Sequence, residues 1–338
     1  MRHINLRTLL VPDGAKQARP SSSGFGLGVI FAAIGAALFS LKAILIKLAY
    51  LPGQGAPFDV DAITLMALRM MFAGPIYLAI FFTLMRRRKG KTPLPRKAVL
   101  GALALGCLGY YICPFLDFNG LKFITAQLER LILFTYPAFV LILGALFFGA
   151  ALSWRGAMFA VLAYAGIGVI YLGGDIASGD NVALGSTLVL ACAVLFALFQ
   201  LLAKPLIAQL GAGLFTCLSM MAASTAVLSH FVIDNIAAGT LDTALSLPPR
   251  IWILGAAIAI MSTLIPSFLV NIAIGKIGPQ TVSMIGMISP IVTIVFAINL
   301  LGEPFGLVDA LGTALTVGGI AAYSWYSGRE KRALNKPV

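Results

Sequence analysis

Charged residues are scarce in this sequence: they make up only 11% of its 338 positions, whereas 60% of the positions are apolar. A soluble domain carries about a quarter charged residues, because its surface must face water. A chain with this composition cannot cover itself with a hydrated surface, so lipid is expected to be its second solvent. The sequence therefore predicts an integral membrane protein.

Cysteine and histidine are also few, with four and two copies. The cysteines all fall inside apolar stretches and show neither CxxC spacing nor the density of a disulfide framework, so we interpret them as packing residues. His3 lies in the amino-terminal tail and His230 at the edge of an apolar stretch. A metal centre is therefore not expected.

Motifs of catalysis and ATP hydrolysis are missing as well. The sequence contains no HExxH, no GxSxG, no cluster of carboxylates with histidine and no GxxxxGK[ST]. We therefore expect neither an enzyme nor an ATP-driven pump, and no cofactor. The first 23 residues lack the apolar core of a signal peptide and are predicted to form a cytoplasmic tail.

Long apolar stretches fill most of the remaining chain. A membrane-spanning helix needs about 20 mostly apolar residues, and ten such stretches follow one another with short connections. They predict an all-α integral membrane protein with ten transmembrane helices. The predicted helices cover residues 24–50, 61–85, 98–119, 124–148, 153–173, 183–206, 212–233, 251–272, 280–301 and 306–326.

Basic residues predict the orientation of these helices. With the amino terminus inside, the inner side collects 18 of the 24 Lys and Arg, and the outer side only Lys122 and Arg250. Cytoplasmic connections of membrane proteins carry such an excess. Both termini are therefore predicted to be cytoplasmic. The same distribution accounts for the net charge of +12 without a nucleic-acid surface.

The two halves of the sequence repeat one another. Residues 27–47 and 184–204 share LG…A-x-LF-x-L-x5-K at one spacing. Because each half holds five predicted helices, an odd number, the second half must be inverted across the membrane. Many secondary transporters have this symmetry and bind substrate at the repeat interface. Further matches pair Pro114 with Pro266, Asn119 with Asn271, Gln127 with Gln280, Pro137 with Pro290, Gly149 with Gly302 and Gly166 with Gly319.

Several short motifs also match those of a known family. They are the Phe39-to-Lys47 pattern, Arg69, Tyr136-Pro137, Ser289-Pro290, Gly302-Glu303 and the glycines Gly312, Gly318 and Gly319. With the ten-helix repeat, they resemble the drug/metabolite transporter superfamily, and within it the EamA-domain members, over residues 24–327. One departure is Ala150, which stands where the second half has Glu303.

The resemblance implies a basket-like bundle around a central cavity, working as an exporter or exchanger in a bacterial inner (plasma) membrane. The chain then divides into four parts. They are a cytoplasmic tail at 1–23, a first five-helix repeat at 24–173, an inverted second repeat at 183–327 and a second cytoplasmic tail at 328–338.

Five charged residues interrupt the apolar stretches, where a charge costs about 2.5–3.5 kcal/mol on insertion scales. They come from four predicted helices. At about 1.5 Å of rise per residue, all five lie in the outer half of the membrane. With Tyr110, Tyr111 and Asn119 they predict a polar cavity, to which the five charges contribute about +1. The five residues are Lys42, Arg69, Asp117, Glu129 and Arg130.

These charges suggest separate roles. Lys42, Arg69 and Arg130 are candidates to bind a carboxylate or another anionic group. Glu129 is a candidate to bind an ammonium group or, like Asp117, a coupling proton. Glu129 and Arg130 are adjacent and hence about 100° apart on the helix, so at most one points squarely into the cavity. Ion pairing that only locks helices together is the alternative, because buried charges in membranes usually pair.

The second half has no matching charges. In place of Lys42 it has Phe199, followed by Gln200, and its other cavity candidate is Asn271. We therefore expect the first half to bind the polar head of a substrate and the second half to offer neutral contacts.

Prolines inside predicted helices are candidates for paired hinges, since each removes a backbone hydrogen bond. Static kinks that only shape the bundle are the alternative. The four prolines are Pro114, Pro137, Pro266 and Pro290.

The sequence thus predicts a secondary active transporter of small polar metabolites, with amino acids as the leading substrates and alternating access as the mechanism. Nucleotide sugars, phosphorylated metabolites and cationic drugs are alternatives, although phosphate would favour more paired Arg and Lys. A channel or a non-transporting membrane protein also fits. The expected partners are a small-molecule substrate, the lipid bilayer and protons, without nucleic acid. Monomer and homodimer stay undecided.

Overall fold

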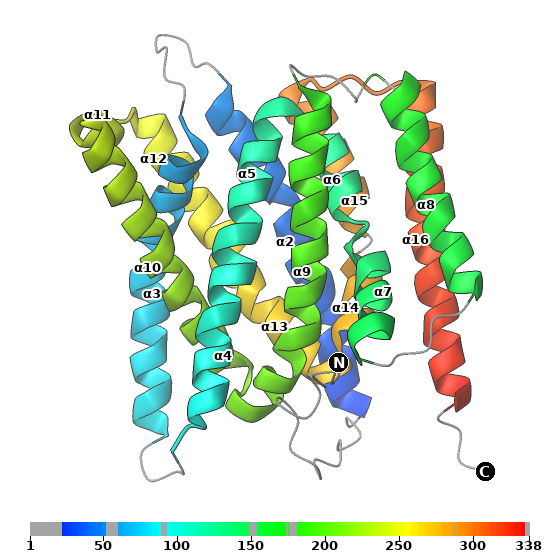
Figure 1. Ribbon diagram of the computed structural model, residues 1–338, viewed down its shortest axis with the longest axis horizontal. Coiled ribbons are helices and arrows are strands. Elements are labelled where there is room, and N and C mark those ends of the chain that lie inside the picture. The colour runs from blue at the N-terminus through cyan, green and yellow to red at the C-terminus, as the bar shows by residue number, and fades with distance from the viewer. Residues whose placement is uncertain are drawn as a thin grey trace, which may run out of the picture.

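The computed structural model describes residues 22–51, 60–88, 93–148, 154–173, 175, 181–286 and 288–334. Within these ranges the regular structure is helical and contains no strand. The helices run side by side along one direction and form a bundle (Figure 1). The predicted all-α class is confirmed.

The first half of the chain forms four helical runs and a final single helix. Two of the runs are interrupted, one by a π-helical segment and one by a break after Leu133. The elements are α2 (Ser22–Tyr50), α3 (Ala62–Arg87), α4 (Arg96–Gly106), η1 (Cys107–Ile112), α5 (Cys113–Phe123), α6 (Ala126–Leu133), α7 (Tyr136–Phe148) and α8 (Trp154–Gly173).

The second half follows the same order. Its elements are α9 (Val182–Leu210), α10 (Ala212–Ala238), α11 (Leu241–Leu245), α12 (Pro249–Ala259), η2 (Ile260–Leu264), α13 (Ile265–Ile277), α14 (Pro279–Gly286), α15 (Ile288–Phe296), η3 (Ala297–Leu301) and α16 (Leu307–Leu334). Every predicted apolar stretch coincides with one of these helices or helical runs. The short α11 was not predicted, and α16 continues beyond the predicted end at 326 into the predicted carboxyl-terminal tail. The amino-terminal tail lies outside the described residues.

Seven helical segments in the described chain are long and apolar enough to cross a membrane. Three shorter apolar helices accompany them, at Tyr164–Gly173, Ser289–Leu301 and Leu307–Gly319. The seven are Phe25–Tyr50, Ala62–Arg87, Arg96–Phe123, Ala126–Phe147, Val182–Leu210, Ala212–Ala238 and Pro249–Ile277.

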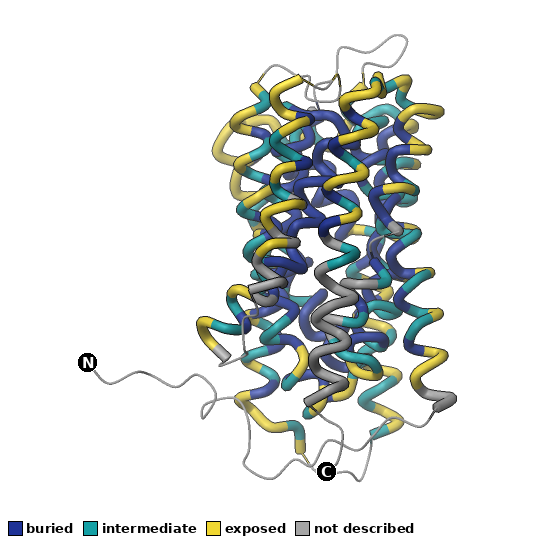
Figure 2. Tube along the Cα trace, turned by 90° about the vertical axis from the view of Figure 1, so that its right-hand side faces the viewer, coloured by how far each residue is buried: buried dark blue, intermediate teal, exposed yellow. Residues whose placement is uncertain are grey.

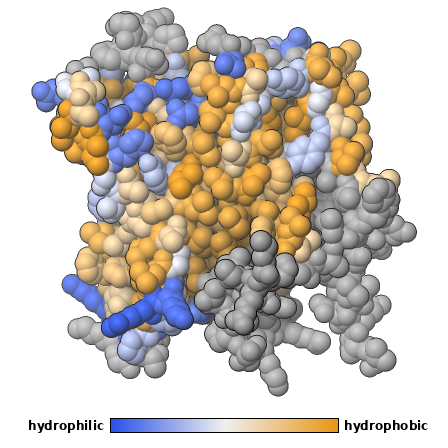
Figure 3. All heavy atoms as spheres, in the orientation of Figure 1, coloured by the Kyte–Doolittle hydropathy of each residue, from blue (hydrophilic) through white to orange (hydrophobic). Residues whose placement is uncertain are grey.

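The outside of the bundle suits lipid. Buried residues follow the inner faces of the helices and exposed residues the outer faces (Figure 2). Large apolar side chains stand on that outer surface, with Leu172 exposed to 88% and Leu307 to 86%. In the view of Figure 3, apolar side chains cover the middle of the bundle, and hydrophilic ones gather on the left near its two ends. An apolar band between polar ends is the surface of a membrane protein.

Helices α8 and α16 pack closely against each other at one side of the bundle (Figure 1). A Cβ atom at Gly312 would lie 2.7 Å from the carbonyl oxygen of Gly166, so neither glycine leaves room for a side chain. Small residues let helix backbones approach in this way in membranes.

The four predicted hinge prolines lie in helical segments. Pro114 and Pro266 are the second residues of α5 and α13, each directly after a π-helical segment, η1 or η2. Pro137 and Pro290 are the second and third residues of α7 and α15, and Pro137 follows the break after α6. The residues that precede α5 and α13, Ile112 and Leu264, have helical φ and ψ, so Pro114 and Pro266 lie inside continuous helical runs. A π-helical segment directly before a proline thus occurs in both halves.

Candidate functional site

A cavity of about 110 Å³ is lined by helices of both halves. The first half contributes Lys42 from α2, Arg69 from α3 and Arg130 from α6, while Gln200 on α9 and Ser289 on α15 come from the second half. Apolar and aromatic side chains provide most of the remaining wall. Among the described lining residues three are cationic and none is acidic.

Lys42 and Asp117 form an ion pair at the edge of this cavity. The Lys42 Nζ lies 2.6 Å from a carboxylate oxygen of Asp117, which is fully buried. Asp117, on α5, does not belong to the cavity lining. Its charge therefore compensates Lys42 from behind, and the ammonium faces the cavity.

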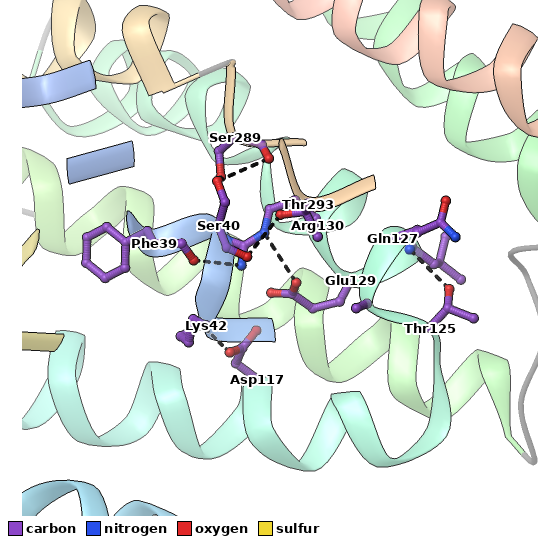
Figure 4. A network of polar contacts seen from close by, with 12 residues as sticks. Phe39, Ser40, Lys42, Asp117, Thr125, Gln127, Glu129, Arg130, Ser289 and Thr293 are labelled. Carbon is purple, nitrogen blue, oxygen red and sulfur yellow. Dashed lines mark hydrogen bonds and ion pairs between the residues drawn. The ribbon is translucent and has the colours of Figure 1, made fainter. Parts of the chain in front are cut away.

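Arg130 and Glu129 form a second, longer pair on α6, with 3.5 Å between Arg130 Nε and a carboxylate oxygen. Arg130 Nη2 also donates to the carbonyl of Phe39 on α2 at 3.1 Å. Only Arg130 lines the cavity, as expected for neighbours about 100° apart. The Glu129 and Asp117 carboxylates lie next to each other behind the lining, between the two cations (Figure 4).

Arg69 is the cation in the cavity wall without an acidic partner. It is 3% exposed, and no described carboxylate lies within ion-pair distance of it. Its Nη2 donates to the carbonyl of Tyr110 at 3.2 Å, and its guanidinium lies 5.4 Å from the ring centroid of Phe118. Pro114, four residues after Tyr110, has no N–H to offer this carbonyl. Arg69 Nε finds no hydrogen-bond acceptor among the described residues.

The second half contributes neutral polar atoms without partners. Gln200 Oε1, Ser262 Oγ and Thr263 Oγ1 all belong to cavity-lining residues that are at most 3% exposed. None of these atoms has a hydrogen-bond partner among the described residues. Buried polar groups in proteins are normally paired, so these atoms are available to a ligand.

The remaining predicted cavity residues divide into two groups. Tyr110 lines the cavity, and its hydroxyl accepts from Asn271 Nδ2 at 2.9 Å, which places the buried Asn271 just behind the wall. Tyr111 and Asn119 do not line it. The Tyr111 hydroxyl instead lies 3.0 Å from His230 Nδ1, because adjacent helical residues face different directions. Asn119 donates to the carbonyl of Phe115 one turn earlier.

Sequence reasoning missed a polar link between the halves. The hydroxyls of Ser40 on α2 and Ser289 on α15 lie 2.7 Å apart, and Thr293 donates to the carbonyl of Ser40 at 3.2 Å. Ser262 and Thr263 were missed too. A hydroxyl group costs little free energy in an apolar stretch, so a serine or threonine that lines a cavity cannot be recognised from the sequence alone. The Ser289-Pro290 motif was the one available hint.

The described residues contain no group of three or more His, Cys, Asp or Glu side chains that could hold a metal ion. The site therefore presents three cations, two carboxylates behind them and several neutral polar atoms, all in an apolar enclosure. Such an arrangement can hold a polar molecule with an anionic group.

Comparison with known proteins also indicates a transporter. The model of the EamA-like transporter family matches twice, over residues 26–172 and 183–325. An "Uncharacterized transporter YcbK" of Bacillus subtilis (strain 168) is 31% identical over 298 residues, covering 84% of this chain and 88% of the relative.

A solved structure titled "Crystal structure of protein" covers 93% of this chain and all of its own, with a TM-score of 0.60 and 20% identity, and therefore supports the fold. Each half of the chain thus carries one copy of the family domain, and the cavity lies between them. The chain belongs to the EamA-like transporter family of the drug/metabolite transporter superfamily.

Proposed function

We propose that this transporter carries small metabolites through the cavity by binding their anionic group, with amino acids as the leading substrates. The observation that carries the proposal is Arg69, a buried cation in the cavity wall that has no acidic partner among the described residues. A buried charge in a membrane protein needs compensation. A substrate carboxylate would supply it and would give Arg69 Nε its missing acceptor.

The charge balance supports a single anionic group. Lys42 with Asp117 and Arg130 with Glu129 each sum to zero, so Arg69 leaves a net charge of +1. One carboxylate neutralises the site. The two negative charges of a phosphate would exceed the single positive charge of the site.

The neutral wall of the second half supports a substrate with further polar groups. An α-ammonium group needs acceptors, and Gln200 Oε1, Ser262 Oγ and Thr263 Oγ1 have none of their hydrogen-bonding capacity used by described residues. A second candidate class is an organic anion without an ammonium group. The absence of an acidic side chain among the described lining residues favours it.

For the mechanism we propose alternating access between two inverted five-helix halves, ten transmembrane helices in all. Two features support it: both halves line one cavity, and each half has a π-helical segment directly before a proline. An even number of spans agrees with α2 beginning and α16 ending at the same end of the bundle (Figure 1). We propose that this end is cytoplasmic, which the distribution of Lys and Arg supports, and that the membrane is the inner one.

Proton coupling is part of the proposal. Glu129 and Asp117 are adjacent buried carboxylates, and like charges at this range repel unless a proton or a cation lies between them. Movement of Lys42 or Arg130 toward a bound anion would weaken their ion pairs and favour uptake of a proton by the carboxylate pair.

Counterflow in proteoliposomes tests the function. Vesicles are preloaded with one unlabelled compound, and uptake of the labelled compound is followed. The panel covers the amino acids, their amide analogues and small organic acids without an amino group, with and without a pH gradient. We expect saturable exchange of compounds with a free carboxylate and none of their amides. Equal exchange of acids and amides would contradict the anion site.

A further inference from the structure

The turn before α16 contacts the amino end of α6, which belongs to the other half of the chain. One carboxylate oxygen of Glu303 accepts from the backbone N–H of Ala126 at 2.7 Å, and the other accepts from that of Gln127 at 3.2 Å. Gln127 Nε2 in turn donates to the carbonyl of Pro304 at 3.1 Å. Gly302 has φ +65°, a conformation that favours glycine, so the turn that presents Glu303 is specified by the sequence. Three hydrogen bonds thus join the two halves at one end of α6.

These bonds matter for α6 because it is only eight residues long. The first N–H groups of a helix have no intrahelical acceptor, and short helices are marginal by themselves. Thr125 caps the N–H of Leu128 from within the same half, and Glu303 accepts from the two N–H groups before it. A carboxylate at this end also interacts favourably with the helix dipole.

Arg130 lies four residues after Ala126, about 6 Å along the axis of α6. The contact with Glu303 therefore fixes the helix that holds Arg130 in the cavity wall and Glu129 behind it. Glu303 is thus a positioning residue for the site, although it does not line the cavity.

The matching position of the other half does not offer this contact. The sequence repeat pairs Ala126 with Pro279 and Glu303 with Ala150. Pro279 begins α14 and has no backbone N–H to donate, and an alanine at 150 has no carboxylate to accept. The symmetry-related contact thus lacks its carboxylate in the first half and one of its two N–H donors in the second half, so the chain carries the complete link at one end of the repeat pair only.

We propose that Glu303 is a latch that holds the two halves together at the outer end of the bundle and must release α6 when the cavity opens outward. The proposal rests on the alternating-access function proposed above. Because a population shifts with the free energy of the contacts that differ between states, the latch favours the outwardly closed state. The orientation follows from the charge distribution, which places the turn at 302–306 on the outer side.

Two native cysteines provide the reporter. Cys113 and Cys192 line the cavity, and both side chains are nearly inaccessible in this structure. In a background in which Cys107 and Cys217 are replaced by serine, their alkylation by a membrane-impermeant thiol reagent measures how often the cavity opens. Right-side-out and inside-out vesicles report the outer and inner openings separately.

In Glu303→Ala, which removes both carboxylate bonds, we expect alkylation from the outer face to rise by about tenfold. Glu303→Gln keeps one acceptor oxygen and should give an intermediate rate, and Gln127→Ala removes only the bond to Pro304. Alkylation from the inner face should fall or stay unchanged. If Glu303→Ala is not recovered as a folded protein, the other two variants carry the test.

Asp61→Ala is the matched control. Asp61 caps α3 by accepting from the N–H of Thr64 at 3.2 Å, a carboxylate-to-backbone bond within one half. Its removal weakens a helix end without separating the halves, so outer alkylation should stay at the wild-type rate. Equal rates in Asp61→Ala and Glu303→Ala, or a rise from the inner face instead, would overturn the latch. Alkylation needs no substrate, so a wild-type protein that exchanges no carboxylate would refute the proposed function while the latch is still tested.

Discussion

The two halves share a backbone pattern but not a chemistry. Each has a π-helical segment directly before a proline, at Pro114 and Pro266. The first half adds three cations and two carboxylates, whereas the second half adds amides and hydroxyls. In the proposed function, the shared pattern provides the path across the bundle, and the residues that differ bind the substrate.

Helix α3 shows how the two kinked regions are joined. Its Arg69 donates to the carbonyl of Tyr110 next to Pro114, and its Tyr77 donates to the carbonyl of Thr263 next to Pro266 at 3.3 Å. Residues eight apart lie on one face of a helix, so α3 stabilises both regions at once. Of these two residues, the charged Arg69 lines the cavity and contacts the first half, whereas the neutral Tyr77 contacts the second half.

The largest effect is expected from removing the charge that distinguishes the halves. Arg69→Gln should lower carboxylate exchange by about 100-fold, because losing one partner of a buried charged hydrogen bond costs about 2–5 kcal/mol. Arg69→Lys should recover part of the rate, since it keeps the charge but not the planar fork. Initial rates of counterflow provide the measurement.

Arg250→Gln is the control for this change, because Arg250 also donates to a backbone carbonyl, that of Leu48, but on an exposed surface. If Arg69→Gln exchanged substrate at the wild-type rate, the positive charge that only the first half contributes would not take part in binding.

Lys42→Met tests the ion pair of the first half, and it places an apolar side chain where the second half has Phe199. It should destabilise the protein by about 3–5 kcal/mol, because it leaves the buried Asp117 without its cation. Adding Asp117→Asn should restore most of the loss. Thermal unfolding in detergent micelles compares the single and double variants. A double variant no more stable than Lys42→Met would contradict the pairing.

Glu129→Gln separates binding from coupling. For one proton per substrate, a gradient of one pH unit drives accumulation of about tenfold. The variant should keep counterflow without a gradient and lose this accumulation, since the amide cannot take up a proton. The measurement is substrate uptake in the presence of a known pH gradient. Retained accumulation in the variant would show that Glu129 does not take part in proton coupling.

The smallest effect is expected in the neutral half. Gln200→Leu should raise KM by about two- to tenfold, the range of one neutral hydrogen bond, with little change in the maximal rate. Asn299→Leu, on an exposed face, is the control. A Gln200 variant as impaired as Arg69→Gln would mean that the second half also binds the charged group.

The sequence predicted the helices well because composition alone fixes them. An apolar stretch of helix length has few alternatives in a bilayer, and its ends are marked by loops rich in charge, Gly and Pro. What it could not predict are the breaks. Pro137 predicts a hinge or kink in 124–148, but the sequence does not show that α6 ends at Leu133. The link from Glu303 to α6 was not predicted either, because it joins residues far apart in the chain.

The candidate site was predictable to the extent that it is charged. Lys42, Arg69, Asp117, Glu129 and Arg130 stand out because each is costly in lipid, and the structure brings all five together. Which of the predicted side chains point into the cavity was harder to predict. Glu129 and Asp117 lie behind the cavity wall, and the Tyr111 hydroxyl contacts His230 instead. Small polar residues such as Ser262 and Ser289 carry no such signal.

The most direct test of the central claim compares substrate binding across a double change. Affinities of the purified protein are measured by calorimetry for the best carboxylate substrate and its amide, with wild-type Arg69 and with Arg69→Gln. If the carboxylate contacts Arg69, losing the substrate charge should cost far more affinity in the wild type than in the variant, a coupling of about 1.5 kcal/mol or more. Equal losses in both proteins would show that the anionic group binds elsewhere and would contradict the account.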